Sequence, residues 1–119
     1  MSNKTILIVD DDPMIAKIIK PFLVGHGYQV LTADNGETAF DLVKLEQPNL
    51  IILDVQMPRM NGYTFILELK NIPGAEKISV IVLTAKDGMA EIFKVEGAKE
   101  YLTKPLNNDR LLEIIRQYT

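Results

Sequence analysis

The stretch ILIVDDDP, residues 6–13, joins an apolar run to three consecutive acids and a proline. A run that is apolar at every position is typical of a strand covered on both faces, as in a parallel sheet. Aspartate is a favoured helix N-cap, and proline is favoured at the first helical position. The stretch therefore predicts a buried strand at residues 6–9, an acidic turn, and a helix that Asp12 caps and Pro13 begins.

The same order of strand and helix recurs along the rest of the chain. Further apolar runs predict strands at residues 29–33, 50–53, 80–83 and 100–102. Apolar side chains at helical spacing predict helices at residues 15–23, 39–43, 63–70, 89–95 and 111–115. Strands that alternate with helices in this way predict an α/β fold with a doubly wound parallel sheet and right-handed crossovers.

The composition is that of a single globular domain. The chain has 119 residues, of which 47% are hydrophobic and 24% charged, so it can form one core and is too apolar to be disordered. Its net charge of -3 argues against nucleic acid or an anionic membrane as the main partner, because both select basic surfaces. It has no cysteine, and no apolar stretch approaches the roughly 18 residues of a membrane span. We therefore expect a soluble protein of a reducing compartment, the cytoplasm.

Reactive side chains directly follow most of the predicted strands. The acids at residues 10–12 follow the first strand, Asp54 the third, Thr84 the fourth, and Thr103 and Lys104 the fifth. Parallel strands end at a common edge, and the ligands of open parallel sheets bind there. Packing requires no carboxylate, hydroxyl or ammonium group at this edge, so their presence predicts a functional site.

The acids at this edge predict a divalent cation. Converging carboxylates repel one another unless a cation lies between them or one of them holds its proton. Oxygen ligands without histidine or cysteine favour Mg²⁺ or Ca²⁺ over zinc or copper. Beside a phosphate group, Thr84 can donate a hydrogen bond and Lys104 can supply a positive charge. A carboxylate can also act as a nucleophile and form an aspartyl phosphate, so the edge has the groups that phosphoryl transfer needs.

Taken together, the motifs resemble those of the receiver domain of bacterial response regulators, the family that includes the chemotaxis regulator. They are ILIVDD at residues 6–11, LDVQMP at 53–58, LTA at 83–85 and KP at 104–105, in the family's order. Each motif alone is weak, whereas the ordered set is specific. The resemblance implies a flavodoxin-like sheet of five parallel strands in the order 2-1-3-4-5, flanked by five helices. It also implies one receiver domain over residues 1–119, with no effector domain.

The resemblance assigns a metal and phosphoryl site. Asp54 corresponds to the phosphoacceptor. Asp10 and Asp11 correspond to the acidic pair that holds Mg²⁺, with Asp54 and the backbone carbonyl of Gln56 as further ligands. Asp12 lies beyond this pair, and we expect it to cap the following helix rather than to bind the metal.

The resemblance also assigns a switch. Thr84 corresponds to the switch hydroxyl, Lys104 to the phosphate-binding lysine, and the Lys104–Pro105 peptide bond is cis in the family. Tyr101 corresponds to the switch aromatic, whose ring moves inward when Thr84 turns toward the phosphoryl group. A half-buried strand aromatic without a switching role is the alternative for Tyr101.

The implied function is a step in two-component signal transduction. A partner histidine kinase or phosphotransfer protein would phosphorylate Asp54 reversibly, and the phosphoryl group would bias a two-state surface. A downstream protein would read this surface on the face formed by the fourth helix, the fifth strand and the fifth helix. Catalysis would be limited to the chain's own phosphorylation and dephosphorylation, so we do not expect an enzyme with a separate substrate.

Two other functions fit parts of the pattern. An Mg²⁺-dependent phosphatase of small molecules could use Asp54 as its nucleophile. The loops after the strands are short, however, and offer neither a lid nor an obvious general acid. A docking module that acts without phosphorylation is disfavoured, because every matched site position keeps a chemically competent residue.

Overall fold

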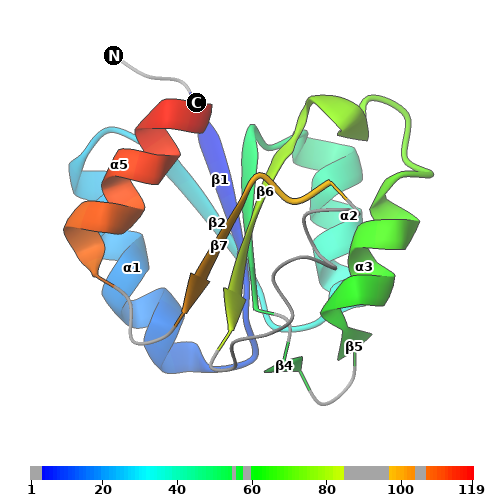
Figure 1. Cartoon of the computed structure of the whole chain (residues 1–119), viewed down its shortest axis with the longest axis horizontal. Helices are drawn as coiled ribbons and strands as arrows, with labels where there is room; N and C mark the ends of the chain where they lie inside the picture. The colour runs from blue at the N-terminus through cyan, green and yellow to red at the C-terminus, as the bar shows by residue number, and fades with distance from the viewer. Residues whose placement is uncertain (1–3, 55, 58–59, 85–96, 104–106) are drawn as a thin grey trace.

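Five parallel strands form the central sheet of the protein in the computed structural model (Figure 1). The structure describes residues 4–54, 56–57, 60–84, 97–103 and 107–119. The strands are β1 (Thr5–Val9), β2 (Gln29–Ala33), β3 (Leu50–Asp54), β6 (Ser79–Thr84) and β7 (Glu100–Thr103). Their order across the sheet is β2-β1-β3-β6-β7, and every neighbouring pair is parallel. The predicted strands and the predicted strand order are both confirmed.

Helices cover both faces of the sheet. α1 (Pro13–Gly25) and α5 (Asn108–Tyr118) lie on one side, and α2 (Gly36–Glu46) and α3 (Gly62–Leu69) lie on the other (Figure 1). These helices are confirmed, and the helix predicted at residues 89–95 lies outside the described residues. Because neighbouring strands are parallel, each connection carries the chain from the carboxyl end of one strand back to the amino end of the next. The carboxyl ends of all five strands therefore lie together, and we call this end of the sheet its carboxyl edge.

Two apolar clusters bury the strands on both faces. Alternate strand residues point to opposite faces of a sheet. Leu7 and Leu53 belong to the cluster beneath α2 and α3, whereas Ile8 and Ile52 belong to the cluster beneath α1 and α5. All four side chains are at most 1% exposed. This two-sided burial is what a continuous apolar run predicts, and it makes the sheet a firm support for groups at its edges.

Helix α1 begins as the sequence predicts. Asp12 is its N-cap, and the Asp12 carboxylate accepts a hydrogen bond from the backbone N–H of Met14 at 3.0 Å. Pro13 is the first helical residue, at a position where an N–H would have no partner within the helix. The Asp12 cap and Pro13 thus fix the acidic turn between β1 and α1. After the helix the chain turns through Gly27, whose φ of 94° lies in the left-handed region that favours glycine.

Three short elements have no counterpart in the sequence prediction. β4 (Gln56–Met57) pairs in antiparallel fashion with β5 (Met60–Asn61), and η1 (Ala75–Lys77) is a 3-10 turn. Elements of two or three residues have no measurable hydrophobic period, so pattern analysis does not detect them.

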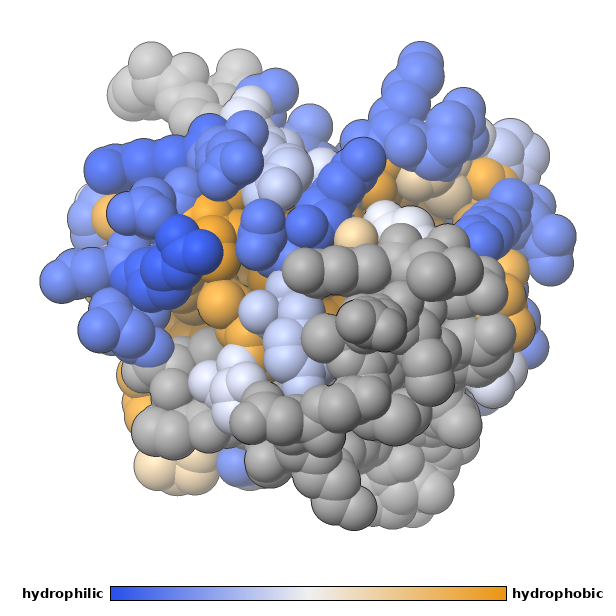
Figure 2. Space-filling view, in the orientation of Figure 1, coloured by the Kyte–Doolittle hydropathy of each residue, from blue (hydrophilic) through white to orange (hydrophobic). Residues whose placement is uncertain are grey.

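The coloured surface in Figure 2 is mainly hydrophilic, and hydrophobic side chains reach it in the seam between α5 and β7. Large apolar side chains that are exposed elsewhere include Met14 and Ile18 on α1 and Leu45 on α2. Among the helices that the structure describes, none has the length and apolar character needed to cross a lipid bilayer.

Replacement of Ile8 by alanine tests the packing of the sheet. Ile8 is 1% exposed, so we expect Ile8→Ala to lower the free energy of unfolding by about 2–5 kcal/mol. Leu45→Ala is the matched control, because Leu45 is 78% exposed and its truncation should change that free energy by less than about 0.5 kcal/mol. Urea denaturation measures both values, and equal losses would contradict the assignment of Ile8 to the core.

Candidate metal centre

The register of the sheet brings the ends of β1 and β3 side by side. Val9, the last residue of β1, pairs with Leu53 on β3. The next residues along the two strands are Asp10 and Asp54, so both acids lie at the carboxyl edge of the sheet. Asp10 is only 6% exposed and Asp54 only 3% exposed. Burial of two neighbouring carboxylates is costly unless something compensates their charge.

Three carboxylates converge at this edge. One oxygen from each of Asp10, Asp11 and Asp54 lies within 4.8 Å of the others. Asp11 is exposed, so the group opens to solvent on that side. The structure thus brings together the three acids that the sequence analysis singled out.

Backbone hydrogen bonds hold Asp10 in place. The Asp10 N–H donates to the carbonyl of Ala33, the last residue of β2, at 3.0 Å. The Asp10 Oδ1 accepts the backbone N–H of Asp12 at 2.9 Å. The sequence analysis did not predict this second bond. Its signal in the sequence is that Asp10 lies two residues before the residue whose N–H its carboxylate accepts, which is the pattern of an Asx turn. Asp12 is therefore the predicted helix cap, and its backbone also orients Asp10.

The three acids fit a hard divalent cation. Mg²⁺ takes oxygen ligands at about 2.1 Å, so two ligands of one ion lie at most about 4.2 Å apart, and Ca²⁺ takes them at about 2.3–2.6 Å. The separations of up to 4.8 Å between the carboxylate oxygens are close to what a shared ion requires. A bound cation would also offset the repulsion between neighbouring negative charges. Oxygen-only ligands select such a cation over zinc or copper.

The ends of β6 and β7 lie at the same edge as the acids. In the sheet register Asp54 pairs with Leu83, and Thr84 pairs with Thr103. The backbone of Thr84 therefore ends β6 one residue beyond the level of Asp54. This register agrees with a site that draws on several strand ends.

Some of the predicted site groups lie beyond what the structure describes. Gln56 begins β4, two residues after Asp54, and its backbone is described. Lys104 and Pro105 lie outside the described residues, as does the cis peptide bond predicted between them. The roles of these residues and of the Thr84 side chain therefore remain predictions.

Tyr101 lies on β7, half-buried against the apolar cluster beneath α2 and α3. Beside it, the Tyr118 hydroxyl donates a hydrogen bond to Oε2 of Glu100 at 2.9 Å, which ties α5 to β7. That hydrogen bond, together with desolvation, raises the pKa of Tyr118, so deprotonation of Tyr118 breaks the tie as the pH rises through this raised value. The half-buried position of Tyr101 agrees with both alternatives for it, and its switching role remains a prediction.

A cavity of about 500 Å³ adjoins the acids on the side of α1 and β2. Asp10 and Asp11 contribute to its wall, together with Lys17 on α1 and Asp34 after β2. The acidic edge is therefore open to a ligand from this side.

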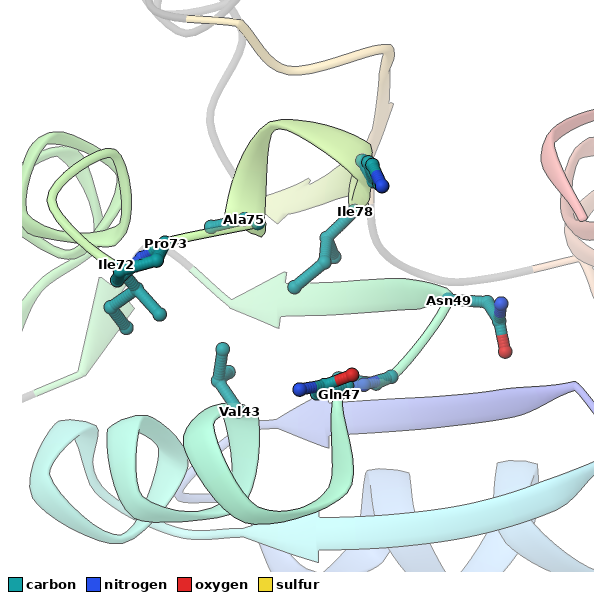
Figure 3. Close-up of a pocket in the computed structure, with 10 residues that line it drawn as sticks. Val43, Gln47, Asn49, Ile72, Pro73, Ala75 and Ile78 are labelled. Atoms are coloured by element: carbon teal, nitrogen blue, oxygen red, sulfur yellow. The ribbon is translucent and has the colours of Figure 1, made fainter.

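A second cavity, of about 240 Å³, lies at the opposite edge of the sheet (Figure 3). It lies between the end of α2 and residues 72–78, and Val43 and Ile78 point into it from the two sides. Two of its lining residues, Asn49 and Ile78, directly precede β3 and β6, whereas the acids end or follow strands. None of the residues that line this cavity is acidic, so it is separate from the candidate metal centre.

Comparisons with known proteins cover nearly the whole chain. The family model of the response regulator receiver domain matches residues 6–116. Protein PilH of Pseudomonas aeruginosa is 38% identical over 112 residues, in an alignment that covers 92% of this chain and 93% of PilH.

Solved structures show the same fold. The chemotaxis protein CheY4 of Vibrio cholerae has a TM-score of 0.91 at 28% identity, over 99% of this chain and 100% of that chain. The response regulator TrrA of Thermotoga maritima, solved in complex with Mg(2+)-BeF, has a TM-score of 0.85 at 33% identity. This second similarity covers 98% of this chain and 99% of the TrrA chain.

Mg²⁺ should stabilise the protein through the three acids. At a Mg²⁺ concentration 100 times the Kd, a single site adds about 2.7 kcal/mol to the free energy of unfolding. We expect Tm to rise when Mg²⁺ is added to chelator-treated protein, and Asp10→Asn should abolish most of the rise because it removes a buried charged ligand. Asp41→Asn, at an exposed position on α2, is the control and should keep the full rise. Equal rises in all three proteins would contradict the site.

Proposed function

Because the chain belongs to the response regulator receiver domain family, we propose that it accepts a phosphoryl group on Asp54 from a histidine kinase or phosphotransfer protein. The observation that carries the proposal is the convergence of Asp10, Asp11 and Asp54 at the carboxyl edge of the sheet. The proposed cofactor is Mg²⁺, which is part of the complex of the similar protein TrrA. Phosphorylation would then switch a surface that a downstream protein reads.

The proposed reaction is a displacement at phosphorus. A carboxylate oxygen of Asp54 attacks the phosphoryl group of a phosphohistidine, a P–O bond forms, and the P–N bond breaks with its electron pair returning to the imidazole nitrogen. When bound, Mg²⁺ supplies positive charge that offsets the charge of the phosphoryl oxygens. Asp10 and Asp11 would hold it, with Asp54 and the backbone carbonyl of Gln56 as further ligands. Catalysis by the chain is limited to its own phosphorylation and dephosphorylation.

We assign the other phosphoryl contacts to Thr84 and Lys104. The pairing of Thr84 with Thr103 supports this assignment, because Lys104 directly follows Thr103 along the chain. A threonine hydroxyl donates a hydrogen bond to a phosphoryl oxygen, and a lysine ammonium group pairs with its charge. The turn of Thr84 toward the phosphoryl group would draw the ring of Tyr101 inward.

The output surface in this proposal is the face formed by the helix predicted at residues 89–95, by β7 and by α5. The hydrophobic side chains in the seam between α5 and β7 support it, because apolar surface at the centre of an interface favours binding of a partner protein (Figure 2). The net charge of -3 gives no electrostatic support for direct binding to nucleic acid or to an anionic membrane.

A small-molecule phosphatase is the second candidate, favoured by the cavity of about 500 Å³ beside the acids. Against it, only residues 10–12 connect β1 to α1 and only residues 34–35 connect β2 to α2, so these connections supply no lid. A docking module that acts without phosphorylation is a third candidate, and it would have no use for three converging acids.

We propose that the chain acts in the cytoplasm as a receiver domain. The family model of the receiver domain, which matches residues 6–116, supports the assignment of these residues to one such domain. The output of this domain would be contact with another protein or relay of the phosphoryl group.

Incubation with acetyl phosphate and Mg²⁺ tests the phosphoacceptor. We expect intact-mass measurement to find one phosphoryl adduct on the wild type and none on Asp54→Asn, because the amide lacks the nucleophilic oxygen. Asp41→Asn is the matched control and should form the adduct normally. Rapid hydrolysis of varied phosphate esters without an adduct would instead favour the phosphatase. Absence of both the adduct and Mg²⁺ binding would leave the docking module.

Removal of the Lys104 ammonium group tests the switch. We expect Lys104→Ala to bind Mg²⁺ with a Kd within about threefold of the wild type, because lysine is not a metal ligand. The variant should lose the change in the Tyr101 amide chemical shift that the phosphoryl mimic beryllofluoride causes in the wild type. Lys77→Ala, at the opposite edge of the sheet, should keep that change. An intact response in Lys104→Ala would refute the role assigned to Lys104.

A further inference from the structure

We propose that Asp12 is a positioning residue for the metal centre: its backbone N–H holds the Asp10 carboxylate while its own carboxylate fixes the start of α1. The inference rests on the proposed function, since it concerns a ligand of the proposed Mg²⁺ site. Asp12 is exposed and is not among the acids that converge, so it would act through Asp10 rather than on the ion.

Asp12 makes hydrogen bonds to a residue that precedes it and to residues that follow it in the chain. Its N–H donates to Oδ1 of Asp10 at 2.9 Å. Its Oδ1 accepts the N–H of Met14 at 3.0 Å, and its carbonyl accepts the N–H of Ile15 at 3.2 Å. The acid turn is thereby linked to the first turn of α1 through a single residue.

The hydrogen bond from Asp12 is one of the contacts that orient Asp10. Its backbone is held on the sheet side, where its N–H donates to the carbonyl of Ala33 at 3.0 Å. Rotation of the carboxylate about its side-chain bonds is limited by the hydrogen bond from Asp12 to Oδ1. Outer hydrogen bonds of this kind orient metal ligands and affect metal affinity.

The proline after Asp12 strengthens the link. Pro13 has no N–H, so the first N–H that α1 offers to a cap is that of Met14, which Asp12 accepts. A residue before proline is also restricted to extended backbone conformations, and Asp12 has φ -88° and ψ 109°. The sequence therefore favours the backbone conformation in which the Asp12 N–H reaches Asp10.

Two substitutions separate the effect of the Asp12 helix cap on the metal centre from the effect of the Asp12 charge. Asparagine is about as good an N-cap as aspartate, so Asp12→Asn keeps the cap and removes the charge. Alanine removes both. Because the Asp12 side chain is exposed, solvent and salt screen its charge. Loss of the helix cap should therefore weaken Mg²⁺ binding more than loss of the Asp12 charge does.

Calorimetric titration with Mg²⁺ tests the proposal. We expect Asp12→Ala to weaken Mg²⁺ binding about tenfold or more, and Asp12→Asn to stay within about threefold of the wild type. Asn35→Ala is the matched control, because Asn35 caps α2 through the same kind of bond, to the Thr38 N–H at 2.8 Å. This variant loses a helix cap without touching Asp10, and its Mg²⁺ affinity should stay within about threefold of the wild type.

Amide hydrogen exchange in the metal-free protein gives a second readout. The protection factor of the residue 12 amide, which is the exchange rate of the unfolded chain divided by that of the folded protein, should fall about tenfold in Asp12→Ala and should stay at the wild-type value in Asp12→Asn. Equal weakening of Mg²⁺ binding in Asp12→Asn and Asp12→Ala would overturn the proposal, as would wild-type affinity in Asp12→Ala. If the wild type binds no Mg²⁺, the proposed function fails, and the role of Asp12 toward the metal fails with it. If the wild type binds Mg²⁺ and the protection factor is unchanged in Asp12→Ala, the inference alone is overturned.

Discussion

Like-charge repulsion between Asp10, Asp11 and Asp54 is the physical constraint at the carboxyl edge of the sheet, because the pairing of β1 with β3 holds these acids together. Asp10 and Asp54 are nearly inaccessible, so water screens their charges poorly. An anionic phosphoryl group would meet the same repulsion at Asp54. A bound divalent cation would offset the repulsion among the acids and the repulsion of the phosphoryl group, so we expect the proposed phosphorylation to depend on such a cation.

The rest of the fold keeps this constraint in force. Apolar clusters cover both faces of the sheet, so β1 and β3 cannot separate without exposing buried side chains such as Ile8 and Ile52. The backbone of Asp10 is bonded to Ala33 on one side, and its carboxylate is bonded to the Asp12 N–H on the other. The acids are therefore held in place before any ligand arrives. Such preorganisation lowers the cost of binding.

The features that the sequence predicts correctly depend on neighbouring residues or on the parallel order of the strands. The cap at Asp12 and the helix start at Pro13 depend on neighbouring residues alone, and both are confirmed. The common edge of Asp10 and Asp54 follows from parallel strands that end together. The hairpin of β4 with β5 and the bond from Asp12 to Asp10 were not predicted, because they depend on backbone torsions within short turns. Short turns have no periodic pattern, and the Asx-turn spacing of Asp10 and Asp12 shows only that their bond is possible.

The position of a bound paramagnetic ion tests the metal centre most directly. Mn²⁺ takes the oxygen ligands that Mg²⁺ takes, and it broadens the NMR signals of nearby nuclei. On titration with substoichiometric Mn²⁺, we expect the amide signals of Asp11 and Asp54 to disappear, while those of Gln47 and Ile78 at the opposite edge keep their intensity. Broadening that spares Asp54, or that affects both edges of the sheet equally, would contradict a metal centre at the converging acids.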